Sequence, residues 1–460
     1  MRERTKTTRC LFGIRTALAA LLVLSAASCR KESGVSKMVN PNDRVCSSYA
    51  SQFEAVWQGM DQGYTFWADD TVDWDARYAA FRPVFESFDT MAYVSQAAYQ
   101  AAYDGLFEGL LDHHLMGIFF APGGNGKLAV VSPGSNDYAH TTNAYAERER
   151  ELEVLRNRSD LVKYVGFDQS VDPKYGIEVP GTYFALIKGR HDGEMIAYFR
   201  FTNFYLSELI QNRDNLYYQI SALAPIKAFY GTANGTGMTA YGYANNDSVV
   251  GIVFDLRGNG GGHTSDLAPF VGSLSQGNNV VGYTRVKDGF GRLDYSPWAA
   301  YSIGCPKDHL VSPKPVVALV DINSVSCAEL ATMLVKGMPN GTVIGERTYG
   351  AVGALLPNSS YSHDMFYNGC MGEYELYTDF QQYGYLGYDE LTRIYQSQYK
   401  GVFPFYVYTS TFNMVDRDYR QVEGVGVQPD IEVLFDRNRL WNDKVDVQLN
   451  RAITFIKTGR

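Results

Sequence analysis

Ser326 is the residue of this sequence whose type and surroundings best fit a chemical step. It follows a continuous apolar run, residues 316–320 (VVALV), and precedes a helix that the pattern extends to about Lys336. A serine at a strand-to-helix turn lies at the carboxyl end of a sheet, where open α/β sheets bind ligands. The free N–H groups of the helix N-terminus can stabilise an oxygen that becomes negative. The arrangement suits a nucleophile, although serine is also a common helix N-cap.

A glycine run, residues 258–262 (GNGGG), is the second half of the pattern. It follows another buried-strand run, residues 249–256, so its loop should leave the same edge of the same sheet as Ser326. Glycines let the backbone come close to a ligand atom. We therefore expect N–H groups of Gly260, Gly261 and Cys327 to form an oxyanion hole. A phosphate loop is disfavoured, because no Lys-Ser/Thr pair follows the glycines.

The periodicity of the chain predicts an α+β protein of several domains that positions these two loops. Three amphipathic helices, the last at about residues 90–111, predict a helical bundle over 44–116. Residues 117–205 are expected to be mostly β, with a hairpin formed by 183–188 and 195–201. Residues 206–460 are expected to form an α/β core with a largely parallel sheet, because 248–343 follows the order β-α-β-β-α-β. A closing helix is predicted at 445–456.

The first residues form a targeting segment for export and are not expected to be part of the fold. Residues 1–28 have the basic start and short apolar run of a signal peptide, and the small residues before Cys29 fit a bacterial lipobox. We expect Cys29 to be lipidated, with residues 29–43 as a tether, which predicts an exported protein of the cell envelope, as an outer-membrane lipoprotein. A cleaved signal peptide without lipidation is the alternative.

Charge and cysteine content exclude several other classes. The formal net charge is −9, and no basic run follows the signal segment, which argues against nucleic acid as a partner. No Cys/His spacing indicates a metal, and the pair His113–His114 has no third ligand nearby in the sequence. No cofactor is expected. Cys305 and Cys370 are the best candidates for a disulfide in an exported chain.

Four motifs in order resemble the C-terminal processing (tail-specific) peptidase family, which includes the tricorn core. They are DLRGNGGG at 255–262, SVSCAE at 324–329, GERTYG at 345–350 and GVGVQPD at 424–430. The resemblance implies a crotonase-like ββα-spiral core and a serine peptidase of peptides or unfolded protein tails. It also implies that Ser326 is the nucleophile and forms an acyl-enzyme. No PDZ-like segment is evident.

The general base does not follow from this resemblance. Family members with a Ser-Lys dyad have lysine where this chain has Ala351, and the position of the tricorn-type histidine corresponds to Arg200, which cannot serve as a base. His114 and His263 are the remaining candidates. Two hypotheses stay open: an active serine peptidase, or an impaired peptidase fold that binds peptide or apolar ligands. Cysteine chemistry at Cys327 is a weaker third.

Overall fold

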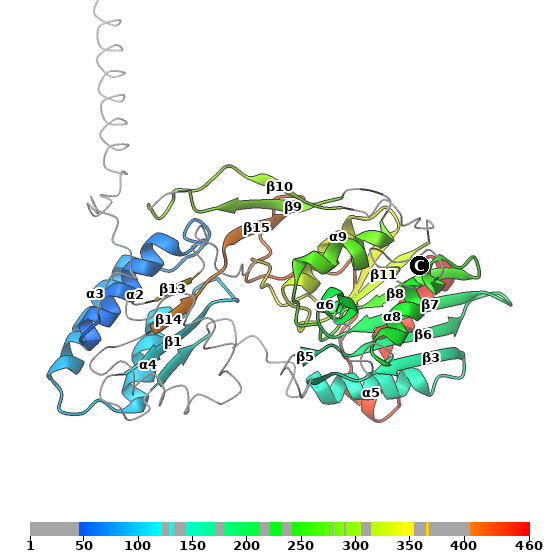
Figure 1. Cartoon of the computed structure of the whole chain (residues 1–460), viewed down its shortest axis with the longest axis horizontal. Helices are drawn as coiled ribbons and strands as arrows, with labels where there is room; N and C mark the ends of the chain where they lie inside the picture. The colour runs from blue at the N-terminus through cyan, green and yellow to red at the C-terminus, as the bar shows by residue number, and fades with distance from the viewer. Residues whose placement is uncertain are drawn as a thin grey trace, which may run out of the picture.

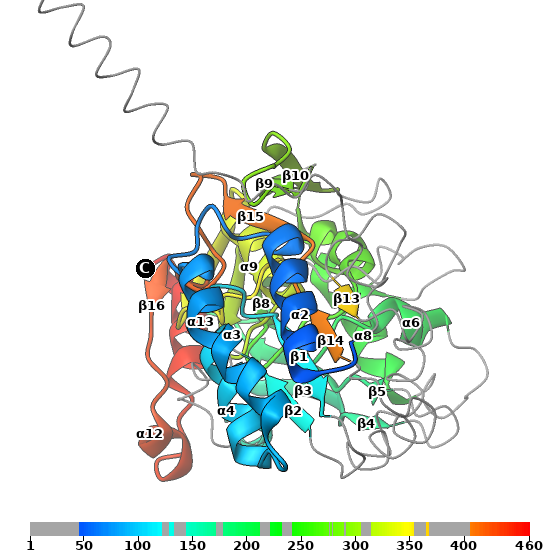
Figure 2. The same ribbon diagram turned by 90° about the vertical axis from the view of Figure 1, so that its left-hand side faces the viewer.

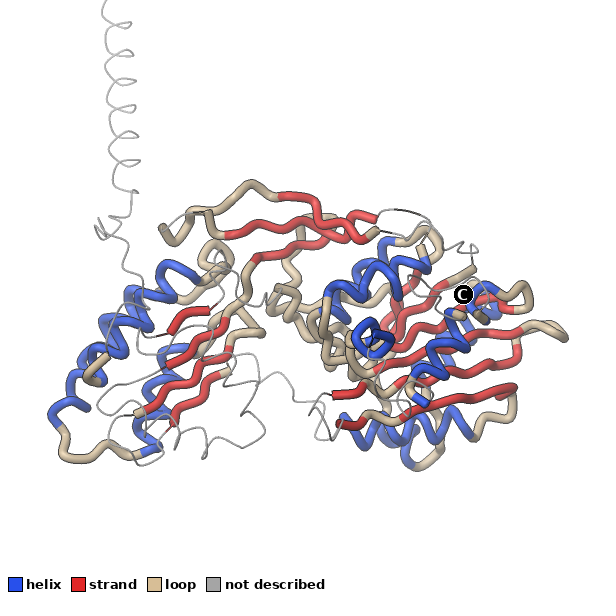
Figure 3. Tube along the Cα trace, viewed as in Figure 1, coloured by secondary structure: helices blue, strands red, loops and turns tan. Residues whose placement is uncertain are grey.

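The computed structural model forms two lobes joined by a narrow antiparallel sheet (Figures 1 and 3). It describes residues 46–121, 128–132, 144–171, 178–211, 221–231, 242–275, 277, 279–288, 291–304, 314–353, 365–367 and 405–460. Cys29, the signal segment, Cys305 and Cys370 lie outside these residues. No helix among the described residues is both long and apolar enough to cross a bilayer.

The N-terminal lobe packs three helices against a four-stranded antiparallel sheet (Figure 2). Polar residues cap the helices at their N-termini: Ser48, Asp73 and Ser95 each accept a backbone N–H. The helices are α2 (Tyr49–Gly63), α3 (Trp74–Thr90) and α4 (Gln96–Phe107). The strands, in sheet order, are β13 (Met365–Tyr367), β14 (Phe405–Tyr408), β1 (Met116–Phe120) and β2 (Leu128–Val131). The predicted helices therefore exist, but they cover a sheet that includes strands from far along the chain.

The second lobe is built on a seven-stranded mixed sheet. In sheet order its strands are β16 (Ile431–Glu432), β12 (Gly341–Gly345), β11 (Val316–Val320), β8 (Val249–Asp255), β7 (Met195–Phe201), β6 (Thr182–Lys188) and β3 (Leu161–Phe167). The pairs from β16 to β7 are parallel, and β6 and β3 are antiparallel. The hairpin that we placed in a separate β segment thus belongs to the core sheet. A two-stranded sheet, β4 (Ser170–Val171) with β5 (Glu178–Val179), lies beside it.

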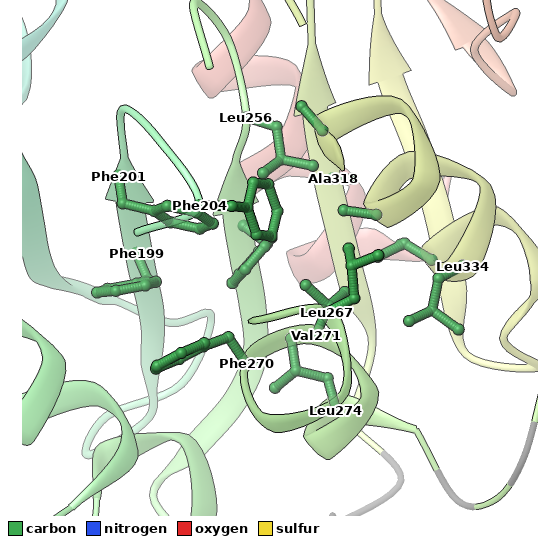
Figure 4. Packing of buried hydrophobic residues seen from close by; sticks show 14 of the residues in the cluster. Phe199, Phe201, Phe204, Leu256, Leu267, Phe270, Val271, Leu274, Ala318 and Leu334 are labelled. Atoms are coloured by element: carbon green, nitrogen blue, oxygen red, sulfur yellow. The ribbon is translucent and has the colours of Figure 1, made fainter. Parts of the chain in front are cut away.

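Helices cover both faces of this sheet (Figure 1). One apolar cluster joins a face of the sheet to α6 (Leu206–Gln211), α8 (Leu223–Tyr230) and α9 (Cys327–Gly337), and a second cluster joins the other face to α5 (Ala144–Arg156) and α13 (Val447–Thr458). The short helix α12 (Arg437–Trp441) lies next to α5. All five residues of β11 are buried, as expected of a central parallel strand. Figure 4 shows the first cluster, where Leu267 and Val271 from the short turns after the glycine run pack near Leu334 of α9.

A three-stranded antiparallel sheet spans the two lobes (Figure 1). It consists of β10 (Ala299–Ile303), β9 (Asn279–Val286) and β15 (Phe412–Asp416). The connection between β9 and β10 reaches the N-terminal lobe, where Arg292 pairs with Asp61 and Asp75. We expected β9 in the parallel sheet; it pairs instead with β15, a partner that its local sequence does not specify. The α+β class is confirmed.

Candidate active site

The backbone of Ser326 has a conformation that side-chain-bearing residues rarely adopt. Its φ is 58° and its ψ is −118°, directly before α9 begins at Cys327. Only two other non-glycine residues in the described part of the chain, Tyr419 and Lys444, have positive φ. Such strain costs about 1–3 kcal/mol and persists only where the surroundings enforce it, which is common at functional sites. Ser326 is half-buried.

The glycine run meets the serine turn directly, as the sequence predicted. The Val325 N–H donates to the Asn259 carbonyl at 2.9 Å. Gly261 has φ +89°, and a Cβ placed there would lie 2.7 Å from the Cβ of Ser326 and 3.1 Å from the Cys327 nitrogen. Gly261 therefore permits a contact between the two loops that no residue with a side chain would allow.

The N–H groups expected to form the oxyanion hole are not all free. The Gly260 N–H donates to the Thr202 carbonyl at 3.1 Å, and the Gly261 N–H donates to the Asn259 side chain at 2.9 Å. The Cys327 N–H, at the first turn of α9, has no acceptor among the described residues. In this conformation the N–H groups of Gly260 and Gly261 are engaged in other hydrogen bonds. Of the three expected oxyanion donors, the Cys327 N–H stays available. The Cys327 thiol has its pKa raised to about 12 by burial, which disfavours the cysteine hypothesis.

Glu329 fixes the serine turn from within α9. It is fully buried and accepts four hydrogen bonds: from the Ser326 N–H (3.1 Å), the Thr348 hydroxyl (2.6 Å), the Gly350 N–H (2.7 Å) and the Ala351 N–H (2.7 Å). Burial raises the pKa of Glu329 to about 7, while these donors act in the opposite direction. Its role is to position Ser326 relative to the segment that follows β12.

Glu423 continues the same line of hydrogen bonds. It is fully buried and accepts the N–H groups of Val352, Gly353 and His113, each at 2.9 Å. Four successive N–H groups of the segment 350–353 are therefore held by two buried glutamates. Burial, and then the charge of Asp112, raise the pKa of Glu423 well above its usual range. This line of contacts connects the serine turn of the core to the histidine pair of the N-terminal lobe.

His114 lies beside Glu423, at the point where the two lobes meet. One ligand atom each from Asp112, His114 and Glu423 lies within 4.8 Å of the others. Burial lowers the pKa of His114 to about 4. A hydrogen bond to the backbone of Gly353 acts in the opposite direction but has the smaller effect. The imidazole is therefore neutral at neutral pH, as a general base must be. No basic side chain among the described residues is hydrogen-bonded to the Ser326 hydroxyl in this conformation.

The other candidate base and the two variant positions have different surroundings. His263 is exposed, packs its ring against Tyr205 at 5.0 Å, and has no contact with Ser326 among the described residues. Arg200 is 2% exposed and pairs with Glu151 at 2.6 Å, so it serves the buried charge network below the glycine loop. Ala351 is fully buried in a small apolar cluster with Ile322 and Tyr349.

Glu423 and Asp112 were not predicted from the sequence as site residues. Glu423 directly precedes the motif at 424–430, and Asp112 directly precedes the histidine pair. Their positions next to these motifs were the only sequence signal for a role in the site. Neither residue lies in a local pattern that suggests a chemical function. Their proximity to His114 becomes visible only when the lobes are docked.

Comparison with known proteins supports the family suggested by the motifs. Residues 197–366 match the model of peptidase family S41, which confirms the resemblance for this part of the chain. No curated protein matches the sequence significantly.

A solved structure with a TM-score above 0.5 shares the overall fold at low sequence identity, and two others are similar at lower TM-scores. A candidate peptidase from Parabacteroides merdae is 18% identical, with a TM-score of 0.57 over 90% of this chain and 98% of that chain. Mature CPAF in complex with lactacystin is 11% identical, with a TM-score of 0.47 over 90% of this chain and 100% of that chain. The photosystem II D1 C-terminal processing protease is 13% identical, with a TM-score of 0.40 over 89% of this chain and 98% of that chain.

Proposed function

We propose that this chain, whose residues 197–366 match the model of peptidase family S41, is a serine endopeptidase of the cell envelope that cleaves peptides or unfolded protein tails. Ser326 is the nucleophile and His114 is the general base. Glu423 lies beside His114 and, when ionised, favours its protonated form. In this proposal His114 takes the role of the lysine of the family's Ser-Lys dyad, whose position is occupied by Ala351 in this chain.

One observation carries the proposal: the hydrogen-bond line that joins Ser326 to the histidine pair. Glu329 accepts the Ser326 and Ala351 N–H groups, and Glu423 accepts the Val352 and His113 N–H groups. These bonds are all between buried or half-buried groups, where an unmade hydrogen bond costs about 1–3 kcal/mol. The segment 350–353 is thus a rigid spacer between nucleophile and base. His114 is neutral at neutral pH and lies within 4.8 Å of a buried carboxyl group, so its imidazole is in the form that can accept a proton.

The reaction follows from these roles. The Ser326 hydroxyl oxygen attacks the scissile carbonyl carbon while its proton passes to His114. The oxyanion receives the Cys327 N–H at the N-terminus of α9, where the helix dipole also favours negative charge. The carbon–nitrogen bond breaks as His114 returns the proton to the departing amine. Water, deprotonated by His114, then hydrolyses the acyl-enzyme and restores the serine hydroxyl.

Labelling with a fluorophosphonate, together with hydrolysis of an unstructured peptide, tests the assignment. Ser326→Ala should abolish both signals. His114→Ala should lower kcat/KM by about 10²–10⁴-fold, the usual contribution of a general base. His263→Ala, which removes the exposed rival, should leave kcat/KM within about twofold. Peptide binding without labelling or turnover at any pH would favour the impaired, ligand-binding protein instead.

The cell-envelope location rests on Cys29 and is tested separately. Incorporation of radiolabelled palmitate in the native host should occur in the full chain and be lost in Cys29→Ser. On cell fractionation, the full chain should appear in the membrane pellet and Cys29→Ser in the soluble fraction. A lipid-anchored protein loses its membrane affinity when it loses its acyl chains. Membrane association that persists in Cys29→Ser would refute the anchor.

A further inference from the structure

Asp112, His114 and Glu423 form a group of potential metal ligands that the sequence analysis did not foresee. The histidine pair had no third ligand nearby in the sequence, but the fold brings Glu423 from the core lobe next to His114. One ligand atom from each of the three residues lies within 4.8 Å of the other two. Both carboxylates are fully buried.

The surrounding hydrogen bonds fix the two carboxylates before any ligand arrives. Asp112 Oδ2 accepts the Ser410 N–H at 2.8 Å, and Asp112 Oδ1 accepts the Ser410 hydroxyl and the His114 N–H, each at 2.9 Å. Glu423 Oε1 accepts only the His113 N–H among the bonds described above. Asp112 Oδ2 and Glu423 Oε1 therefore keep lone pairs available. Ligands oriented in this way by their neighbours are a general feature of metal sites.

The third member of the group provides an independent indication. His114 Nδ1 is buried and has no hydrogen-bond partner in the described part of the chain. A buried nitrogen without a partner is costly, and this imidazole lies within 4.8 Å of two buried carboxyl groups, which can only accept hydrogen bonds when they are ionised. Converging acceptor atoms of this kind are stabilised by a proton shared among them or by a metal ion that displaces it.

The ligand types indicate which metal. One imidazole nitrogen and two carboxylate oxygens suit zinc and neighbouring first-row ions, whereas Mg²⁺ prefers oxygen ligands in octahedral geometry. Zn–N and Zn–O bonds of about 2.0–2.2 Å place two ligands at most about 4.4 Å apart, and closer in a tetrahedron. In a tetrahedron the ligands lie about 3.4 Å apart. The three ligand atoms lie within 4.8 Å of one another, so the group must contract by up to about 1.4 Å to hold Zn²⁺, with a fourth position for water.

We propose that Asp112, His114 and Glu423 bind one Zn²⁺ ion and that this ion inhibits the peptidase reversibly. The inhibitory part rests on the proposed function, because zinc would occupy the lone pair of the His114 imidazole and hold the ring away from proton transfer. The binding part does not depend on catalysis. Free zinc would then set the fraction of active enzyme.

The binding test uses the full mature chain carrying Ser326→Ala, which removes self-cleavage. Titration of Zn²⁺ against a chromophoric chelator should give one site per chain, and Mg²⁺ should not compete. Adding Asp112→Asn or His114→Ala should weaken binding by more than about tenfold. Adding His191→Ala, an exposed histidine remote from the group, should not change it. Zinc affinity that is the same in all four proteins would overturn the site.

Two further measurements separate the parts of the proposal. Co²⁺ added to the Ser326→Ala chain should give visible absorption bands of four-coordinate intensity, lost when Zn²⁺ is added; weak octahedral bands would contradict the site even if a variant misfolds. In the active chain, Zn²⁺ should lower kcat/KM with a midpoint equal to its measured dissociation constant, and EDTA should restore the rate. Zinc that binds at this group without slowing hydrolysis would refute the inhibition and the role of His114 as base together.

Discussion

The contact between Gly261 and the serine turn gives the sharpest test of the active-site geometry. In Gly261→Ala, the new Cβ would lie 2.7 Å from the Ser326 Cβ and 2.8 Å from the Val325 carbonyl oxygen. Its neighbour provides a matched control. In Gly260→Ala, the nearest atom to the new Cβ is the Asn203 side-chain nitrogen at 3.8 Å, an ordinary contact, and Gly260 is not among the glycines with positive φ.

The expected cost has two parts. An alanine at φ +89° is strained by about 1–3 kcal/mol. Carbon atoms normally pack at about 3.5–4.0 Å, so the loops must also separate by about 1 Å. The Val325 N–H is tied to the glycine loop at 2.9 Å, so this separation breaks that bond and moves Ser326. A displacement of about 1 Å can cost about 100-fold in rate, which corresponds to about 2.7 kcal/mol of lost transition-state stabilisation.

The assay is kcat/KM for peptide hydrolysis, with the rate of fluorophosphonate labelling as a second readout and thermal unfolding as a check on folding. We expect Gly261→Ala to lose about 100-fold and Gly260→Ala to lose less than about fivefold. Equal rates in the two variants, with both proteins folded, would show that the loops do not meet at Ser326 during catalysis. The contact between Gly261 and the serine turn would then not determine the catalytic geometry.

Three further predictions concern groups around the site. Glu329→Gln places an amide against backbone N–H donors, so we expect the unfolding free energy to fall by about 1–3 kcal/mol and labelling of Ser326 to slow, measured by chemical denaturation and by labelling rate. Arg292→Ala removes the pairs with Asp61 and Asp75; we expect a loss of about 2 kcal/mol in denaturant, less than for a fully buried pair, and no loss would contradict a structural role. Burial lowers the pKa of Lys287 to about 8, so the unfolded chain binds more protons from pH 8 to about 10.5. Stability should rise with pH in that window, and a difference curve against Lys287→Met that stays flat would refute this.

The strands of the core were predictable because their information is local. The run at 316–320 is apolar throughout, and every residue of β11 is buried on both faces of the sheet. The glycine run and Ser326 were predicted to meet for a reason that needs no distant contact: both follow parallel strands, whose carboxyl ends share one edge. In the structure β8 and β11 are adjacent and parallel.

Pairing between distant segments was not predictable in the same way. Residues 280–285 were correctly predicted as a strand, but the sequence pattern does not indicate which strand pairs with it. In the structure β9 pairs with β15 rather than with a strand of the parallel sheet. β14 likewise pairs with β1 in the N-terminal lobe, so the three helices cover a sheet that no local sequence pattern predicts. Alternation of apolar residues identifies a strand and its buried face; its neighbours depend on the whole chain.

The proposed base was hard to identify from the sequence for a related physical reason: the proposed nucleophile and the proposed base come from different lobes. Ser326 belongs to the core, whereas His114 precedes β1 in the N-terminal lobe, and their relation depends on contacts such as His113 with Glu423. Arg292 touches neither residue but helps to hold the lobes together. If the site is assembled by docking, Arg292→Ala should lower kcat at temperatures where the protein is still folded. It should not change the intrinsic affinity of the Cys327 turn for an oxyanion. A variant that loses stability but keeps full kcat would mean that the lobes stay docked without the ion pairs of Arg292.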